Sequence, residues 1–134
     1  MKIRLGFFAI AIVTLFAALS FAQAKPYTPE KGSPERKAIL DAVRKFRKAQ
    51  SEVYSPWGFS VMKGWAYVAA PDPNEPDVDT AGFEYILRKT GTSWKVVDKV
   101  SHVEGTDPEK EKKRIKRHFP SVPLAIFPVL ASDG

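Results

Sequence analysis

The spacing of hydrophobic residues predicts which parts of this chain form helices and which form strands. Ile39, Val43 and Phe46 recur every three or four residues. This is the period of one helix face, so a helix is expected over residues 34–48. Ser33, directly before it, supplies a hydroxyl that can accept a bond from a free amide at the helix start. The remainder of the helix surface is strongly basic.

After a break of proline and glycine at residues 56–58, hydrophobic residues alternate with a period of two. This alternation predicts strands, because successive side chains of a strand point to opposite faces of a sheet. We expect one antiparallel sheet of about four strands, with tight turns at residues 63–64 and 90–92. The expected strands cover residues 59–62, 65–70, 83–89 and 93–103.

A second, short and basic helix is expected after Thr106. Thr106 and Glu109 have the spacing of a capping box, in which a hydroxyl and an acid three residues apart satisfy each other's free amides. Ile115 and Phe119 are its only large apolar residues, which predicts weak packing. The apolar tail, residues 122–130, contains two prolines and is expected to lie across the domain as an extended cover.

Residues 1–24 have the layout of a secretory signal peptide. Lys2 and Arg4 precede an uncharged apolar run over residues 5–21, and small alanines flank a cleavage point at Ala24. An uncleaved membrane anchor is the alternative, but it needs about 20 apolar residues to cross a bilayer core of about 30 Å. We therefore expect a soluble mature chain that begins at Lys25, has no transmembrane anchor, and is periplasmic or secreted.

Composition narrows the class of protein further. The 134 residues carry a formal net charge of +6, and loss of Lys2 and Arg4 would leave 19 basic against 15 acidic residues, a charge of +4. A chain of this length makes one small domain, here residues 34–134, preceded by an extended N-terminus over residues 25–33. The sequence contains no cysteine, which excludes disulfides, thiolate metal sites and a lipid attached to cysteine.

Four segments resemble a group of small bacterial exported proteins of unassigned function. They are GSPERKAILDAVR at 32–44, GWAYV at 64–68, YILRK at 85–89 and WKVVD at 94–98. The resemblance covers residues 32 to about 100 and implies an α+β fold, in which a curved antiparallel sheet wraps an N-terminal helix as in cystatin-like and nuclear-transport-factor-two-like folds. It implies no catalytic residue, and it does not extend beyond about residue 106.

The basic helix is the main candidate for a binding surface. It places six cations within eight residues, with one acid among them, and such a surface attracts anions. For an exported protein the expected partner is an anionic envelope component or an acidic protein, and not nucleic acid. Trp57, in an expected loop, is either a further candidate contact or a plug at one end of the core. The basic residues are Lys110, Lys112, Lys113, Arg114, Lys116 and Arg117.

A catalytic alternative rests on Asp98 and His102, which by alternation share one face of the fourth expected strand with Val96. The carboxylate could orient the imidazole as a general base in a small hydrolase or isomerase, or line a small-ligand pocket. The two residues are separated by about 13 Å along a strand, at about 3.3 Å per residue, so Asp98 is better explained by pairing with a lysine or arginine. Acids of the loop over residues 72–79 lack the spacing of a calcium site. We expect a binding module without metal or cofactor.

Overall fold

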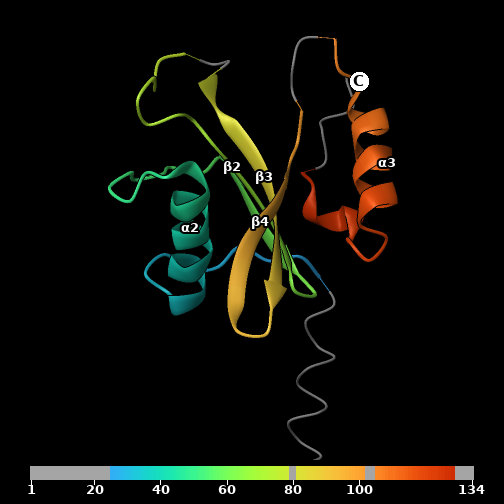
Figure 1. Ribbon diagram of the computed structural model, residues 1–134, viewed down its shortest axis with the longest axis horizontal. Helices are drawn as coiled ribbons and strands as arrows, with labels where there is room; N and C mark the ends of the chain where they lie inside the picture. The colour runs from blue at the N-terminus through green and yellow to red at the C-terminus, as the bar shows by residue number, and fades with distance from the viewer. Residues whose placement is uncertain (1–24, 79–80, 102–104, 129–134) are drawn as a thin grey trace, which may run out of the picture.

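An antiparallel sheet of four strands lies between two helical segments in the computed structural model, which describes residues 25–78, 81–101 and 105–128 (Figure 1). The fold is therefore of the α+β class. The expected signal peptide lies outside the described residues. The elements are α2 (Pro34–Arg47), β1 (Gly58–Met62), β2 (Trp65–Ala70), β3 (Phe83–Thr90), β4 (Ser93–Lys99), α3 (Pro108–His118) and the 3-10 helix η2 (Leu124–Ile126). The strands pair in chain order, β1-β2-β3-β4.

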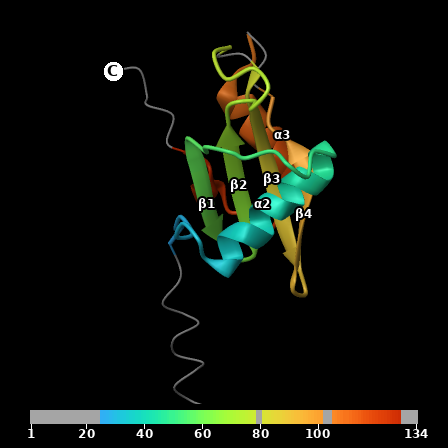
Figure 2. The same cartoon turned by 90° about the vertical axis from the view of Figure 1, so that its left-hand side faces the viewer.

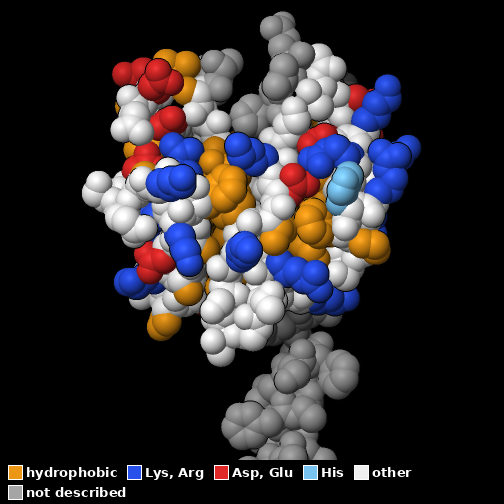
Figure 3. Space-filling model, viewed as in Figure 1, with side chains coloured by type: hydrophobic (Ala, Val, Ile, Leu, Met, Phe, Trp, Pro, Cys, Tyr) orange, Lys and Arg blue, Asp and Glu red, His pale blue; other side chains and the backbone are white. Residues whose placement is uncertain are grey.

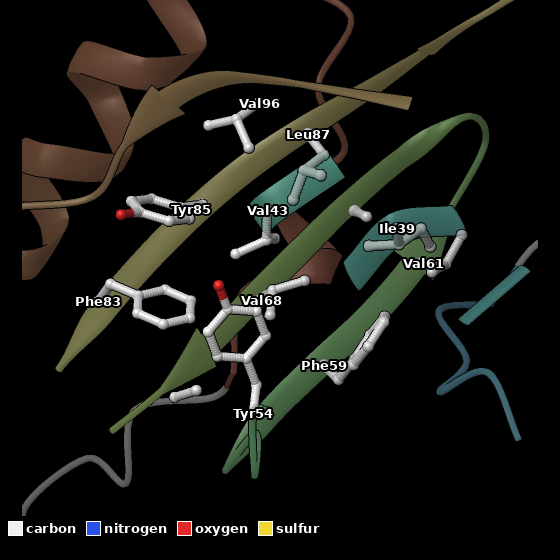
Figure 4. Close-up of a cluster of buried hydrophobic side chains, with 12 residues drawn as sticks. Ile39, Val43, Tyr54, Phe59, Val61, Val68, Phe83, Tyr85, Leu87 and Val96 are labelled. Carbon is white, nitrogen blue, oxygen red and sulfur yellow. The ribbon is translucent and has the colours of Figure 1, made fainter. Parts of the chain in front are cut away.

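Helix α2 forms where the sequence predicts it. The hydroxyl of Ser33 accepts a bond from the amide of Arg36 at 3.2 Å, and Lys48 ends the helix in the left-handed conformation. Its apolar side packs on one face of the sheet, where the side chains of helix and strands meet in a single cluster (Figure 4). The labelled members are Ile39, Val43, Tyr54, Phe59, Val61, Val68, Phe83, Tyr85, Leu87 and Val96.

The C-terminal part of the chain covers the opposite face of the sheet, so that α2 and α3 lie on opposite sides of it in Figure 1. Ile115 of α3 is fully buried, and Phe119 packs against the same cluster. Ile115 and Phe119 are the two apolar anchors that the sequence gives this helix, and its apolar packing rests on them. The tail forms η2 and is not extended throughout its described residues, and residues 129 and 130 of it lie outside the described part. The buried members of this second cluster are Met62, Trp65, Tyr67, Ala69, Ile86, Ile115, Val122, Ile126 and Phe127.

The start of α3 differs from the expected capping box. Asp107 is the N-cap, and its carboxylate accepts a bond from the amide of Glu109 at 2.9 Å. The hydroxyl of Thr106 lies 3.4 Å from the hydroxyl of Ser101 instead. Asp is as good an N-cap as Ser or Thr, and the helix begins one residue later than a Thr106 cap requires.

A β-bulge interrupts the pairing of β3 with β4. Leu87 pairs with Val96, but Ile86 pairs with Asp98, so Val97 is an extra residue on β4. The bulge changes which face the later residues reach. Val96 packs in the cluster under α2, whereas Val97 packs in the cluster on the other face and Asp98 bonds to α3. The expectation that Asp98 shares a face with Val96 is therefore wrong. Strand β4 also ends at Lys99 and not at residue 103, and residues 102–104 lie outside the described part.

Both edges of the sheet are protected against pairing with another chain. On β1, Val61 exchanges two backbone hydrogen bonds with Tyr27, at 3.0 and 2.7 Å, and Ser60 donates to the carbonyl of Ile126. On β4, the exposed lysines Lys95 and Lys99 and the bulge make a poor template for a further strand. The N-terminal segment before α2 is thus part of the domain's structure.

The turn between β1 and β2 generates a stability prediction. Lys63 has φ +51° and Gly64 has φ +78°, the combination of a turn that favours Asn-Gly. Asparagine tolerates positive φ better than lysine, so Lys63→Asn should raise the free energy of unfolding by about 0.5 kcal/mol. Urea denaturation measures this. Lys95→Asn, an exposed lysine within a strand, is the matched control and should bring no gain; an unchanged or lowered stability for Lys63→Asn would contradict the prediction.

Candidate functional site

The cations of α3 separate into an inward set and an outward set. Arg114 points inward: its guanidinium contacts the carboxylate of Glu111 at 2.6 Å, the carboxylate of Asp98 at 3.0 Å and the carbonyl of Lys99 at 3.1 Å. Lys112 forms an ion pair with Glu109 at 3.5 Å. These two basic residues were expected to belong to the binding surface, but the structure uses their charges within the domain.

Glu111 is the residue around which the inward contacts are organised. It is 8% exposed and also accepts a bond from the amide of Ser101 at 3.0 Å. The hydrogen bonds from Arg114 hold the pKa of the Glu111 carboxyl below its usual range, against the opposing effect of burial. Arg114 then fastens α3 to β4 through Asp98 and Lys99, and Glu111 fastens it to Ser101 just beyond the strand. These contacts fix which side of the helix faces solvent.

The outward set lines a shallow hollow of about 470 Å³ on the surface of α3. Lys110, Lys113 and Arg117 are spaced three or four apart, so they share one side of the helix, and Lys116 lies next to Arg117. All of them are basic, and none of the described lining residues is acidic. Figure 3 shows lysine and arginine side chains gathered over α3, with more over α2 and β4 on the same view. The lining residues are Lys110, Lys113, Lys116 and Arg117.

One member of the outward set has a second contact. The ammonium group of Lys116 donates a bond to the carbonyl of Val122 at 2.8 Å, which holds it beside the tail. Within the described part of the chain, Lys110, Lys113 and Arg117 form no ion pair, and all three are exposed. Three of the cations named from the sequence are therefore free to meet an external anion.

The structure does not assemble the acid and histidine pair considered from the sequence. One oxygen of Asp98 contacts Arg114, and the other accepts the amide of Lys99 at 2.8 Å, so both are engaged. His102 lies outside the described residues. His118 places its Nδ1 3.0 Å from the carbonyl of Arg114 near the end of α3. Asp98 has the structural pairing with a basic residue that its position in the sequence favoured.

Trp57 is exposed on the surface near β1. Its side chain is 60% exposed, while its amide donates to the carbonyl of Ala69 at 2.9 Å and fixes the backbone. Val53, in the same connection, is also exposed. Trp57 is therefore not a core residue, and it does not line the hollow on α3 among the residues described there.

A polar cluster that sequence reasoning missed joins the end of α2 to the acidic loop. Arg47 contacts Glu52 at 2.8 Å and Asp72 at 3.4 Å. Glu52 also accepts bonds from the hydroxyl of Tyr54 at 2.8 Å and from the side-chain amide of Asn74 at 2.9 Å. Arg47 holds the pKa of Glu52 below its usual range, and burial together with this bond to Glu52 raises the pKa of Tyr54 to about 12. The members come from separate parts of the chain and follow no local motif.

Asp72 and Asn74 of the acidic loop contact Arg47 and Glu52, so the described part of this loop belongs to the polar cluster. The carboxylate of Asp72 accepts a hydrogen bond from the backbone amide of Asn74 at 2.9 Å, which closes a local turn. No group of three histidine, cysteine or acidic side chains is placed to hold a metal ion in the ranges described, and no described helix is long and apolar enough to cross a membrane.

Comparison with protein-family models, with curated proteins and with solved structures finds no significant match to this chain. The candidate site therefore rests on the geometry of its own residues. The candidate site consists chiefly of the three exposed cations that form no ion pair with described residues, Lys110, Lys113 and Arg117.

The lowered pKa values generate a prediction about acid stability. A carboxyl whose pKa is lower in the folded state contributes stability above its unfolded pKa, about 4.5 for glutamate, and loses that contribution as the pH falls through the folded value. The free energy of unfolding should thus be steady from pH 7 to about pH 5 and fall below about pH 4.5. Urea titrations across this range measure it.

The same titrations separate Glu111 from other acids. Glu111→Gln should cost about 1–2 kcal/mol at pH 7, because Arg114 loses a charged hydrogen-bonding partner, and should flatten the acid decline. Glu109→Gln is the matched control on the same helix turn; its ion pair is exposed and should change stability little. Equal losses of stability in the two variants would mean that the contacts of Glu111 do not hold α3 in place.

Proposed function

We propose that this chain is an exported, soluble binding module that holds an anionic partner, an envelope polymer or an acidic protein, on the outward surface of α3. The observation that carries the proposal is the hollow of about 470 Å³ whose described lining consists of four basic side chains. Like charges on one helix side repel each other, and an anionic partner relieves that repulsion. The module needs no cofactor for this.

The division of the cations supports a surface role for the outward set. Arg114 and Lys112 have acidic partners within the domain, and their charges are compensated there. Lys110, Lys113 and Arg117 gain no such compensation from the described residues, so their field extends into solvent. A mature charge of +4 adds long-range attraction for an anion. Binding of this kind is sensitive to salt, because ions screen exposed charges within about 10 Å at 0.1 M.

The relation to small exported proteins with a cystatin-like or nuclear-transport-factor-two-like fold remains part of the proposal. An N-terminal helix followed by a four-stranded antiparallel meander supports it. A curved sheet that wraps α2 is the form this relation would take. The resemblance ends before α3 and η2, so the layer that they form is not part of this proposed relation.

A catalytic role based on Asp98 receives no support from its contacts, since both of its carboxylate oxygens are engaged. The alternative from the sequence also included binding of a small ligand. A second hollow, at the end of the sheet opposite the β4–α3 contact, supports that part.

Removal of the free cations tests the binding surface. The triple variant Lys110→Gln, Lys113→Gln and Arg117→Gln should bind poly-L-glutamate at least about tenfold more weakly at 50 mM salt, because three charges are lost from one surface. Surface plasmon resonance measures the affinity, and wild-type binding should weaken as salt rises.

The matched control removes the same charge elsewhere. Lys31, Lys45 and Lys95 are exposed, and the variant with glutamine at all three should weaken binding less than about threefold. Equal losses for the two triple variants would show that only net charge matters. Tight binding by wild type that persists at high salt would contradict a contact led by charge.

Export generates a separate prediction. On expression of the full chain in a bacterium, the mature protein should begin at Lys25, because the small residues before it suit signal peptidase. Mass spectrometry of the protein from the periplasm or medium gives its first residue. Ala24→Arg should block this cleavage, and an unprocessed wild-type chain in the cytosol would contradict export.

A further inference from the structure

A second hollow, of about 290 Å³, lies at one end of the sheet. The β1–β2 turn, the β3–β4 hairpin and the beginning of α2 all meet at this end, as Figure 2 shows. Each of these segments contributes a side chain with distinct chemistry. The residues that matter here are Tyr27, Glu35, Lys63, Gly64, Lys89 and Trp94.

Hydrogen bonds hold the walls of this hollow in place. The backbone of Tyr27 is paired with β1, and its hydroxyl donates to the Glu35 carboxylate at 2.6 Å. Burial, with this bond to Glu35, raises the pKa of Tyr27 to about 12, so the hydroxyl remains a donor at neutral pH. The amide of Lys89 donates to the carbonyl of Gly64 at 2.8 Å and ties the hairpin to the turn. The hollow is thus formed before any ligand arrives.

Lys63 and Lys89 both line this hollow together with Trp94, and the ammonium group of Lys89 lies beside the aromatic ring. Lys89 places its Nζ 6.0 Å from the ring centroid of Trp94, which is only partly buried. Neither Lys63 nor Lys89 forms an ion pair within the described residues, and Glu35 is the one acidic residue of the described lining. Positive charge is therefore in excess at this site.

The conformation of Lys63 is a second, independent observation. It has φ +51°, a left-handed conformation that a side chain other than Gly, Asn or Asp adopts at a cost of about 1 kcal/mol. An asparagine would suit the turn better. Strained positions of this kind gather at binding sites, where the side chain has a use that offsets the strain.

We propose that this hollow binds a sugar ring that carries a carboxylate, as in a uronic acid. Lys63 and Lys89 receive the carboxylate, and the apolar face of the ring lies on Trp94. Glu35 has carboxylate lone pairs beyond the one that Tyr27 occupies, and these accept the hydroxyl groups of the sugar. The volume equals about ten water molecules at about 30 Å³ each, which is room for one such ring.

Glu35 decides between a sugar and an aromatic carboxylate. An aromatic ring of the same size offers no hydroxyl donors, so it would cover the charged oxygen atoms of Glu35 without a hydrogen bond in return, which is unfavourable. A neutral sugar, in turn, leaves the two ammonium groups without an anion. The described lining of this site shares no residue with that of the hollow on α3, and the inference does not depend on the function proposed for that surface.

Isothermal titration calorimetry of the full chain with D-glucuronate tests the proposal. We expect saturable binding in the millimolar range, and at least about tenfold weaker binding of D-glucose and of benzoate. The double variant Lys63→Asn and Lys89→Gln should lose at least about tenfold in affinity while circular dichroism shows the native fold, because asparagine suits the turn. Lys95→Gln, a neighbouring exposed lysine that is not among the described lining residues, should bind as wild type does.

Several outcomes would overturn the inference. These are no glucuronate binding up to 50 mM ligand (about the weakest affinity of interest for one ring), unchanged affinity in the double variant, or equal affinity for glucose and glucuronate. Tighter binding of benzoate would exclude the sugar. The triple variant of α3 should bind glucuronate normally, so a loss there would place the carboxylate on α3 and would also reject the site at the turn.

Discussion

The structure depends on burying both faces of one small sheet. Every residue of β2 is buried, which no single helix layer can achieve, because alternate side chains of a strand point to opposite faces. Helix α2 covers one face, and α3 with η2 covers the other. A chain without disulfides obtains its stability from this packing, so the C-terminal segment is a structural layer as well as a carrier of charge.

The way α3 docks also decides what the domain presents to its surroundings. Ile115 enters the core, Arg114 pairs with Asp98 of β4, and Glu111 accepts a bond from the amide of Ser101 just beyond β4. These contacts fix the rotation of the helix about its axis. The lysines and the arginine on the remaining side then face outward together. The bulge at Val97 belongs to the same arrangement, because it turns Asp98 toward α3, where Arg114 pairs with it.

Much of the fold could be predicted from the sequence, and much of the candidate site could not. The cap at Ser33, the helical spacing of Ile39 and Val43, and the alternation after Gly58 are local signals, and the structure confirms the elements they predict. The bulge has no comparable local signal, so the predicted face of Asp98 was wrong. The polar cluster around Glu52 and the hollow beside Trp94 join residues that lie far apart in the chain, and they follow no spacing rule.

Local periodicity and composition were enough to predict the α+β class, the two hairpins, the lack of disulfides and the basic character of α3. Which cations of α3 are paired and which are free depends on how the helix docks, since Arg114 meets Asp98 of β4 only in the folded domain. The tertiary structure likewise decided that both faces of the sheet are covered, and that Lys63, Lys89 and Trp94 meet at one end of it. Long-range packing fixes these relations, and no local pattern encodes them.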